Sequence, residues 1–232
     1  MSYEDELRRE ALRLYARYST EVVERFDLCP WALRARLDGR TSERVILGNN
    51  PRDFAASLAT LKELAEQPKT EVALLIYPEL ELDRLAFETF VRELRLRDAA
   101  GHDFGKSPCA MAAFHPDAPA DLTEPERLIP FLRRTPDPTI QLVRQEVLER
   151  VRGRSPQGTE FVDIRLLSPA ALAQPEPVPL RERIARANLK TVLSAGVSSF
   201  DAIFQGIRRD RSEAYARLRQ RHGPTKAGQS RA

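Results

Sequence analysis

The segment Glu71–Tyr77 constrains the fold most, because it is a continuous apolar run of strand length. A run without polar alternation predicts a strand that is buried on both faces, as in sheets whose strands are joined by crossover helices. Shorter strands are expected at residues 44–47 and 109–114. Between them lie helix-length amphipathic segments, one opened by Asn50-Pro51 and one capped by Asp83.

The order of these segments favours an α/β fold over a series of hairpins. A long first helix is expected to end near Asp27, before the first strand. We predict a three- to four-stranded sheet with crossover helices, the alternative being an α+β ferredoxin-like arrangement. A further helix is expected to begin at Asp137-Pro138 and run to Val151, and residues 159–167 are expected to add a strand.

Three parts are expected along the chain. Residues 1–168 form the α/β core domain, residues 169–222 a basic helical C-terminal extension, and residues 223–232 a disordered tail. Of the 232 residues, 42% are hydrophobic and 31% are charged, which is typical of a soluble globular protein and not of a membrane span. With only two cysteines and no secretion signal at the N-terminus, a cytoplasmic location is expected.

Charge is divided unevenly at Arg150. Residues 151–232 contain fifteen Lys and Arg against seven Asp and Glu, a formal charge of +8, whereas the preceding part has a formal charge of −5. A basic helical surface attracts acidic partners, so a protein partner for the C-terminal helices is a prediction. Nucleic acid is not expected as a partner, because no nucleic-acid-binding motif or set of stacking aromatic residues accompanies the charge. Membrane binding is not expected either.

Cys29 is the first candidate for chemistry. It precedes Pro30, Trp31 and a helix-compatible segment, so it could cap a helix whose positive end favours a thiolate. Such a thiolate is a nucleophile, and Trp31 beside it is a candidate for substrate binding. The alternative is that Cys29 is a small buried side chain packed beside Trp31.

His115 is the second candidate, because it directly follows an apolar strand and begins a proline-rich irregular segment. Ligands of α/β sheets collect beyond the carboxyl ends of strands, so His115 is a candidate general base. Asp117 is close enough in sequence to orient its imidazole. The alternative is a structural histidine that is hydrogen bonded at the strand end.

Two arginines complete the predicted site. Arg134 precedes the expected helix at Asp137 and Arg144 lies inside it, so both are candidates for holding a carboxylate or phosphate. Ion pairing with nearby acids is the alternative for each. Cys109 and His115 share one face of a strand but stand about 20 Å apart, which excludes a shared metal between them. No metal and no cofactor is expected.

Three motifs occur together in this order: Leu28-Cys29-Pro30-Trp31, Phe114-His115-Pro116, and an Arg134-to-Arg144 segment that reads RTPDPTIQLVR. In this combination the chain resembles domain-of-unknown-function family 1415, a bacterial family, over about residues 10–152. The resemblance implies a cytoplasmic bacterial protein and singles out Cys29, His115, Arg134 and Arg144. In that family the first motif usually ends in Phe, and histidine is common where this chain has Gln141.

The sequence therefore supports two functional hypotheses. The first is an enzyme that acts on a small anionic metabolite, with Cys29 as nucleophile, His115 as base, and Arg134 and Arg144 holding the anion. The second is a non-catalytic binding or interaction module that uses its basic helical C-terminus. The first hypothesis requires the thiol, the imidazole and the guanidinium groups to converge on one pocket.

Overall fold

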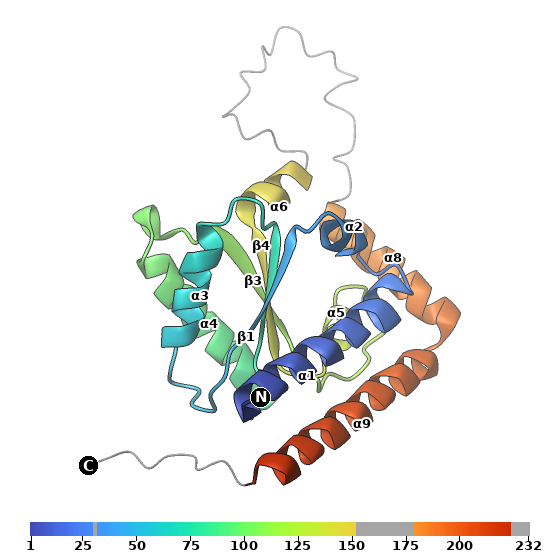
Figure 1. Cartoon of the computed structure of the whole chain (residues 1–232). Coiled ribbons are helices and arrows are strands. Elements are labelled where there is room, and N and C mark those ends of the chain that lie inside the picture. Colours follow the sequence, from blue (N-terminus) through green and yellow to red (C-terminus); the bar gives the residue numbers. More distant parts are fainter. Residues whose placement is uncertain (30–31, 152–178, 224–232) are drawn as a thin grey trace, which may run out of the picture.

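The computed structural model describes residues 1–29, 32–151 and 179–223, and a mixed four-stranded sheet lies at its centre (Figure 1). The strands are β1 (Thr41–Val45), β2 (Val72–Ile76), β3 (Cys109–Phe114) and β4 (Thr139–Arg144), in the order β1-β2-β4-β3. β1 and β2 are parallel, and β4 is antiparallel to both of its neighbours. The predicted α/β class is confirmed.

β4 corrects the prediction of a helix beginning at Asp137-Pro138. Residues 139–144 are a strand, and only Gln145–Val151 is helical (α6). The spacing of Ile140, Val143 and Val147 fits a helix, but Ile140 and Leu142 also alternate as in a strand. Both of these side chains pack on one face of the sheet. Residues 139–144 form a strand because they lie between β2 and β3, where a strand satisfies the backbone hydrogen-bonding groups of both neighbours.

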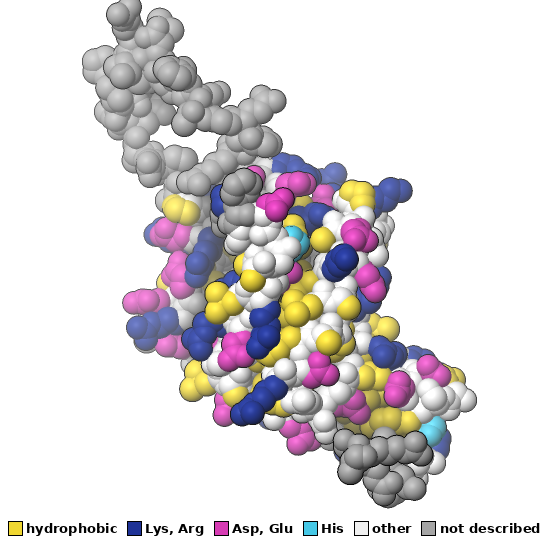
Figure 2. All heavy atoms as spheres, turned by 90° about the vertical axis from the view of Figure 1, so that its left-hand side faces the viewer, with side chains coloured by type: hydrophobic (Ala, Val, Ile, Leu, Met, Phe, Trp, Pro, Cys, Tyr) yellow, Lys and Arg dark blue, Asp and Glu magenta, His cyan; other side chains and the backbone are white. Residues whose placement is uncertain are grey.

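Helices α3 (Ala55–Ala65) and α4 (Arg84–Ala100) are the two crossovers and cover one face of the sheet (Figure 1). The predicted cap is confirmed, since Asp83 Oδ1 accepts a hydrogen bond from the Ala86 amide at 2.8 Å. The predicted start of α3 at Asn50-Pro51 is wrong. Asn50 accepts a hydrogen bond from the Arg52 amide and forms a turn, and the helix begins five residues later. Figure 2 shows this helical face, where charges of both signs are interspersed around hydrophobic side chains.

The opposite face of the sheet is covered by α1 (Tyr3–Tyr18), α5 (Ile129–Leu132), α8 (Leu180–Ala195) and α9 (Val197–His222) (Figure 1). A π-helical stretch, η1 (Ser19–Glu24), continues α1. The predicted C-terminal helices are thus confirmed. They contribute to the core on this face, whose buried members include Tyr18, Leu74, Ile76, Phe131, Val192, Phe200 and Phe204. A helix that supplies core residues adds to the stability of the whole fold.

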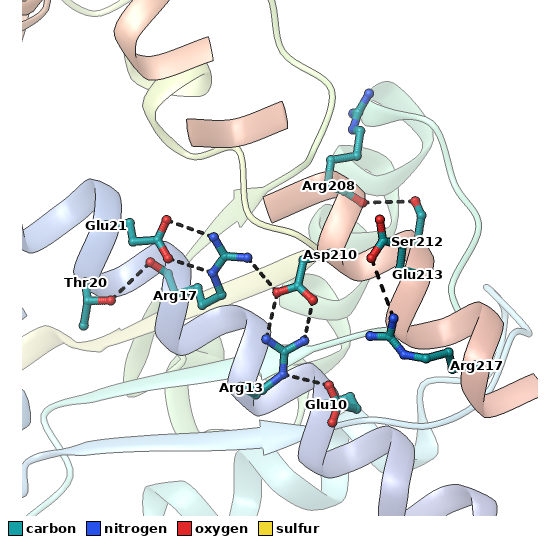
Figure 3. A network of polar contacts seen from close by, with 10 residues as sticks. All are labelled: Glu10, Arg13, Arg17, Thr20, Glu21, Arg208, Asp210, Ser212, Glu213 and Arg217. Carbon is teal, nitrogen blue, oxygen red and sulfur yellow. Dashed lines mark hydrogen bonds and ion pairs between the residues drawn. The ribbon is translucent and has the colours of Figure 1, made fainter. Parts of the chain in front are cut away.

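α9 is fastened along α1 by an ion-pair network (Figure 3). Asp210 accepts hydrogen bonds from Arg13 at 2.7 and 2.8 Å and from Arg17 at 2.6 Å. Glu10 of α1 accepts a hydrogen bond from Arg13, and Glu21 of η1 accepts one from Arg17. These contacts lower the pKa of Asp210 to about 2, because two guanidinium groups stabilise its ionised form.

The smaller elements are α2 (Ala32–Leu37) and a 3₁₀ turn, η2 (Asp103–Gly105). Among the residues that the structure describes, no helix combines the length and the apolar character needed to cross a membrane. The expected strand at residues 159–167 and the expected domain boundary at residue 168 lie outside the described residues. The division into three parts therefore stays a prediction.

Candidate functional site

Cys29 and His115 lie on opposite faces of the sheet, so the expected common pocket is not formed. Cys29 follows η1 and lies by Tyr15 and Tyr18 of the core beneath α1. The ring of His115 contacts Phe87 of α4 on the other face, with centroids 5.9 Å apart. The reason is the alternation of β3: Phe114 faces α1 and α5, and the next residue faces α4.

His115 is engaged by the backbone on both ring nitrogens. Its Nδ1 accepts a hydrogen bond from the Asp117 amide at 3.1 Å, so this nitrogen carries no proton. Its Nε2 lies 2.9 Å from the Leu82 carbonyl oxygen and must donate. The imidazole is thereby held as one neutral tautomer between β3 and the segment before α4. This geometry matches the structural alternative that the sequence left open.

Asp117 and Arg134 are both paired with α9. Exposed Asp117 forms an ion pair with Arg208. Arg134 Nη1 donates to Asp201 at 2.7 Å, its Nε donates to the Pro116 carbonyl at 3.1 Å, and its guanidinium lies over the ring of Phe204. Each group thus has a partner within the chain, and together they fasten α9 to the end of the sheet.

Arg144 lies at the other end of β4, so it shares no site with Arg134. Its guanidinium donates to four backbone carbonyls around the end of α3, those of Leu64, Ala65, Gln67 and Thr70, at 2.6 to 3.2 Å. The last carbonyls of a helix lack partners within it. Arg144 therefore acts as a C-terminal cap for α3.

The thiol of Cys29 is positioned by a tight chain reversal after η1. Asp27 has a φ of 49°, the left-handed conformation that ends helices, and the Leu28 amide donates to the Val23 carbonyl at 2.9 Å. Leu28 is buried in the core beside α1. Cys29 is half-buried and follows this anchor. Trp31, the predicted substrate-binding residue, lies outside the described residues, and so does Pro30, on which the expected helix cap depends.

Arg133 was not included among the predicted site residues, although it directly precedes Arg134 in the sequence. It ends α5, and its guanidinium lies 4.9 Å above the ring of Phe114. Burial lowers the pKa of Arg133, and the positive charge of nearby Arg181 lowers it further. Arg133 forms no side-chain hydrogen bond or ion pair within the described part of the chain. It is thus a half-buried cation without an acidic partner among the described residues.

Cys29 lies near Arg133 and near two tyrosines. Cys29 is close enough to raise the pKa of Arg133, after the larger effects of burial, of Tyr18 and of Arg181. The pKa of Tyr18 is raised by burial, and its hydroxyl donates to the Leu132 carbonyl at 2.7 Å, next to Arg133. The pKa of Tyr15 is raised first by burial and then by the charges of Tyr18, Glu43 and Cys29.

Glu43 completes this group from β1. Its register with Leu74 places it on the sheet face that α1 covers. Burial raises the pKa of Glu43, and its carboxylate has no hydrogen-bond or ion-pair partner among residues 1–29, 32–151 and 179–223. We call Tyr15, Tyr18, Cys29, Glu43 and Arg133 the Cys29–Arg133 site. Within it, a thiol, a guanidinium and a carboxylate are half-buried, and none of the three forms a hydrogen bond or ion pair with another described side chain.

A cavity lies on the other face of the sheet, between the β1–α3 loop and α4. It is a cavity of about 250 Å³ whose walls include Leu47, Asn49, Tyr77, Leu80 and Phe90. Tyr77 shares a hydrogen bond of 3.0 Å with Ser57. The described residues hold no cluster of three or more His, Cys, Asp or Glu side chains suited to a metal ion.

Residues 12–164 match the model of a protein family described as proteins of unknown function, DUF1415. The chain belongs to this family. Comparisons with curated proteins and with solved structures gave no match. The DUF1415 match includes all five residues of the Cys29–Arg133 site. It ends before α8 and α9, and α9 nevertheless supplies Asp201 and Arg208 to the DUF1415 residues Arg134 and Asp117.

Proposed function

We propose that this DUF1415 protein binds a small anionic metabolite at the Cys29–Arg133 site and that Cys29 is the nucleophile of an enzyme there. The observation that carries the proposal is the guanidinium of Arg133. It is half-buried, yet no acidic side chain of the described residues pairs with it. A charge that is partly removed from water without an acidic partner destabilises the fold, and a bound anion would offset that cost.

Arg181 supports the same conclusion from a different element. Its charge reaches Arg133 and lowers the pKa of that guanidinium, so two cations lie near one another at the beginning of α8. Among the described residues, no side chain caps the first amides of this 16-residue helix, whose N-cap is Pro179. Free amides and two guanidinium groups together favour a carboxylate or phosphate.

His115, Asp117, Arg134 and Arg144 take no part in this proposal. Their polar atoms are used by the backbone or by ion pairs of the same chain. The rival hypothesis of a basic interaction module has less support, because Arg208, Arg211, Arg217 and Arg221 of α9 all pair with acids of this chain.

The proposal is tested by comparing two alkylating reagents of similar size, anionic iodoacetate and neutral iodoacetamide. An anion site beside Cys29 raises the local concentration of iodoacetate. We therefore expect the ratio of the alkylation rate by iodoacetate to that by iodoacetamide to be higher at Cys29 than at Cys109. Peptide mass spectrometry reads both thiols in one sample. Inorganic phosphate or succinate is expected to protect Cys29.

Arg133→Met is the decisive variant, because it keeps a long apolar side chain and removes the charge. The iodoacetate preference should fall to that of Cys109. Arg34→Met is the matched control, since Arg34 is an exposed arginine of α2 close to Cys29 in sequence. Thermal unfolding verifies that both variants fold. A preference that is absent in the wild type, or that survives in Arg133→Met, would refute the proposal.

A further inference from the structure

We propose that the cavity between the β1–α3 loop and α4, which we call the Tyr77 cavity, binds a small aromatic amine in its protonated form. The buried residues Tyr77, Leu80 and Phe90 of its lining belong to the core on the sheet face that α3 and α4 cover. The Cys29–Arg133 site lies on the opposite face. The inference therefore goes beyond the proposed function and does not depend on it.

The position of the cavity follows from the two parallel strands. Ile46 and Leu47 directly follow β1, Tyr77 directly follows β2, and all three line the cavity. The Ile46 amide donates to the Ile76 carbonyl at 2.8 Å, so the two strands end side by side. Ligands of open α/β sheets bind outside the carboxyl ends of the strands. The Tyr77 cavity thus lies where this fold class places its ligands.

The floor of the cavity is aromatic, and its rings are held in place. The ring of Phe90 stacks on that of Phe54 with centroids 4.9 Å apart, and the ring of Tyr77 meets Phe90 edge-on at 5.6 Å. The hydroxyl of Tyr77 shares a hydrogen bond with buried Ser57. Because these neighbours fix both rings, the floor is preformed and suits a flat apolar group such as an aromatic ring.

The rim of the cavity is polar and acidic. Gly48, Asn49 and Asp53 are exposed residues of its lining, and no Lys or Arg of the described chain lines it. Asp53 Oδ1 accepts a hydrogen bond from the Ala55 amide at 3.0 Å, which leaves Oδ2 without a partner among the described residues. Glu79 accepts a hydrogen bond from the Gly48 amide at 2.9 Å and forms no ion pair within the same ranges. The rim therefore attracts a cation and repels an anion.

The volume sets the size of the ligand. An apolar cavity of about 150 Å³ admits benzene. The Tyr77 cavity, at about 250 Å³, has room for such a ring and a chain of two carbons. With the ring on the floor, this chain carries an ammonium group to the rim, where the carboxylate of Asp53 can accept a charge-assisted hydrogen bond. The ligand class is thus an arylalkylamine.

The first probe is 2-phenylethylamine. Its counterparts are phenylacetate, which reverses the charge, and ethylamine, which lacks the ring. Titrations of the ¹⁵N-labelled full chain, followed by ¹H–¹⁵N NMR, give each Kd, and the amides of Gly48 and Asn49 report binding at the cavity. We expect 2-phenylethylamine to bind about tenfold more tightly than either counterpart. Equal or tighter binding of a counterpart, or amides that do not shift, would overturn the proposal.

Ala56→Leu fills the cavity from α3 with a residue that favours helices. Binding of 2-phenylethylamine should be lost in this variant. Ala59→Leu is the matched control, because Ala59 is an exposed alanine of the same helix outside the lining, and it should bind as the wild type does. Thermal unfolding verifies that both variants fold. Undiminished binding in folded Ala56→Leu would place the site elsewhere and overturn the proposal.

Asp53→Asn removes the charge and keeps the oxygen that accepts from the Ala55 amide. The preference for 2-phenylethylamine over phenylacetate should fall to near unity, whereas Asp103→Asn, at an exposed aspartate of η2, should keep it. An unchanged preference in Asp53→Asn would overturn the assignment of a cationic ligand. None of these readouts uses the thiol of Cys29, so this proposal and the proposed function can fail separately.

Discussion

Arg211 donates its Nε hydrogen to Asp137 across 2.6 Å, which joins a helix beyond the DUF1415 match to a fully buried carboxylate within it. The hydroxyl of Tyr215 donates to the other carboxylate oxygen at 2.7 Å. Burial raises the pKa of Asp137, and these two donors counteract that effect. α9 therefore neutralises a charge that the α/β part of the chain could not bury alone.

The first prediction is that Arg211→Met destabilises the protein by about 3 kcal/mol. Removing one partner of a buried pair leaves an uncompensated carboxylate. Urea denaturation followed by circular dichroism measures the free energy of unfolding. Arg209→Met, on the exposed side of the same helix, should change it by less than about 0.5 kcal/mol. Equal losses in both variants would show that Asp137 does not depend on this pair.

The second prediction concerns His115. Replacement by Ala removes the acceptor of the Asp117 amide and the donor to the Leu82 carbonyl, which should cost about 2 kcal/mol of stability. The iodoacetate preference of Cys29 should stay at the wild-type value, because the two residues lie on opposite faces of the sheet. A changed preference at Cys29 in folded His115→Ala would contradict the separation of the two residues.

Much of the fold could be predicted because its signals are local. Val72–Ile76 is apolar throughout, so either face of this strand can be buried whatever its pairing with neighbouring strands. Asp83 caps α4 through its own side chain, which is also a local signal. β4 could not be predicted in this way. Its residues fit both a strand and a helix, and only its two neighbours, which are distant in sequence, decide between them.

The site was harder to predict than the fold because it depends on which face each side chain occupies. Cys29 was identified from the motif in which it lies, whereas no sequence motif marks Glu43 or Arg133 as functional residues. The predicted site included Arg134 and not Arg133, although of these two arginines only Arg133 lacks an acidic partner in the described residues. The pairing state of a charge is a property of packing, and adjacent arginines in a sequence do not reveal it.

The third prediction is a pH dependence of the contact between α1 and α9. The pKa of Asp210 is lowered from 3.8 to about 2 by its bonds to Arg13 and Arg17. A carboxylate with a depressed pKa stabilises the folded state fully above pH 3.8 and loses this contribution as the pH falls towards 2. We expect Asp210→Asn to cost about 1 kcal/mol at pH 7, a modest value because the network is partly exposed.

Unfolding in urea at a series of pH values checks this dependence. The difference between the wild type and Asp210→Asn should be constant above pH 3.8 and shrink below it. Glu213→Gln removes an exposed pair with Arg217 on the same helix and should have almost no effect. A difference that persists unchanged near pH 2 would mean that Asp210 acts through packing and not through its charge.

The fourth prediction is that Arg144 is a structural cap that lysine cannot replace. Its planar guanidinium reaches four carbonyls at the end of α3, and an ammonium group has fewer donors without the fork geometry. Arg144→Lys should therefore destabilise the protein by about 1–2 kcal/mol, and Arg144→Met by more, because the carbonyls lose every donor from this side chain.

Arg150→Met, which removes an exposed pair with Glu71, is the control. The iodoacetate preference of Cys29 should be unaffected in all three variants, since Arg144 lies on the sheet face opposite the Cys29–Arg133 site. The contrary result would be an Arg144→Lys variant that is as stable as the wild type but in which anions no longer protect Cys29. Arg144 would then belong to the binding site, and its separation from Arg133 would be wrong.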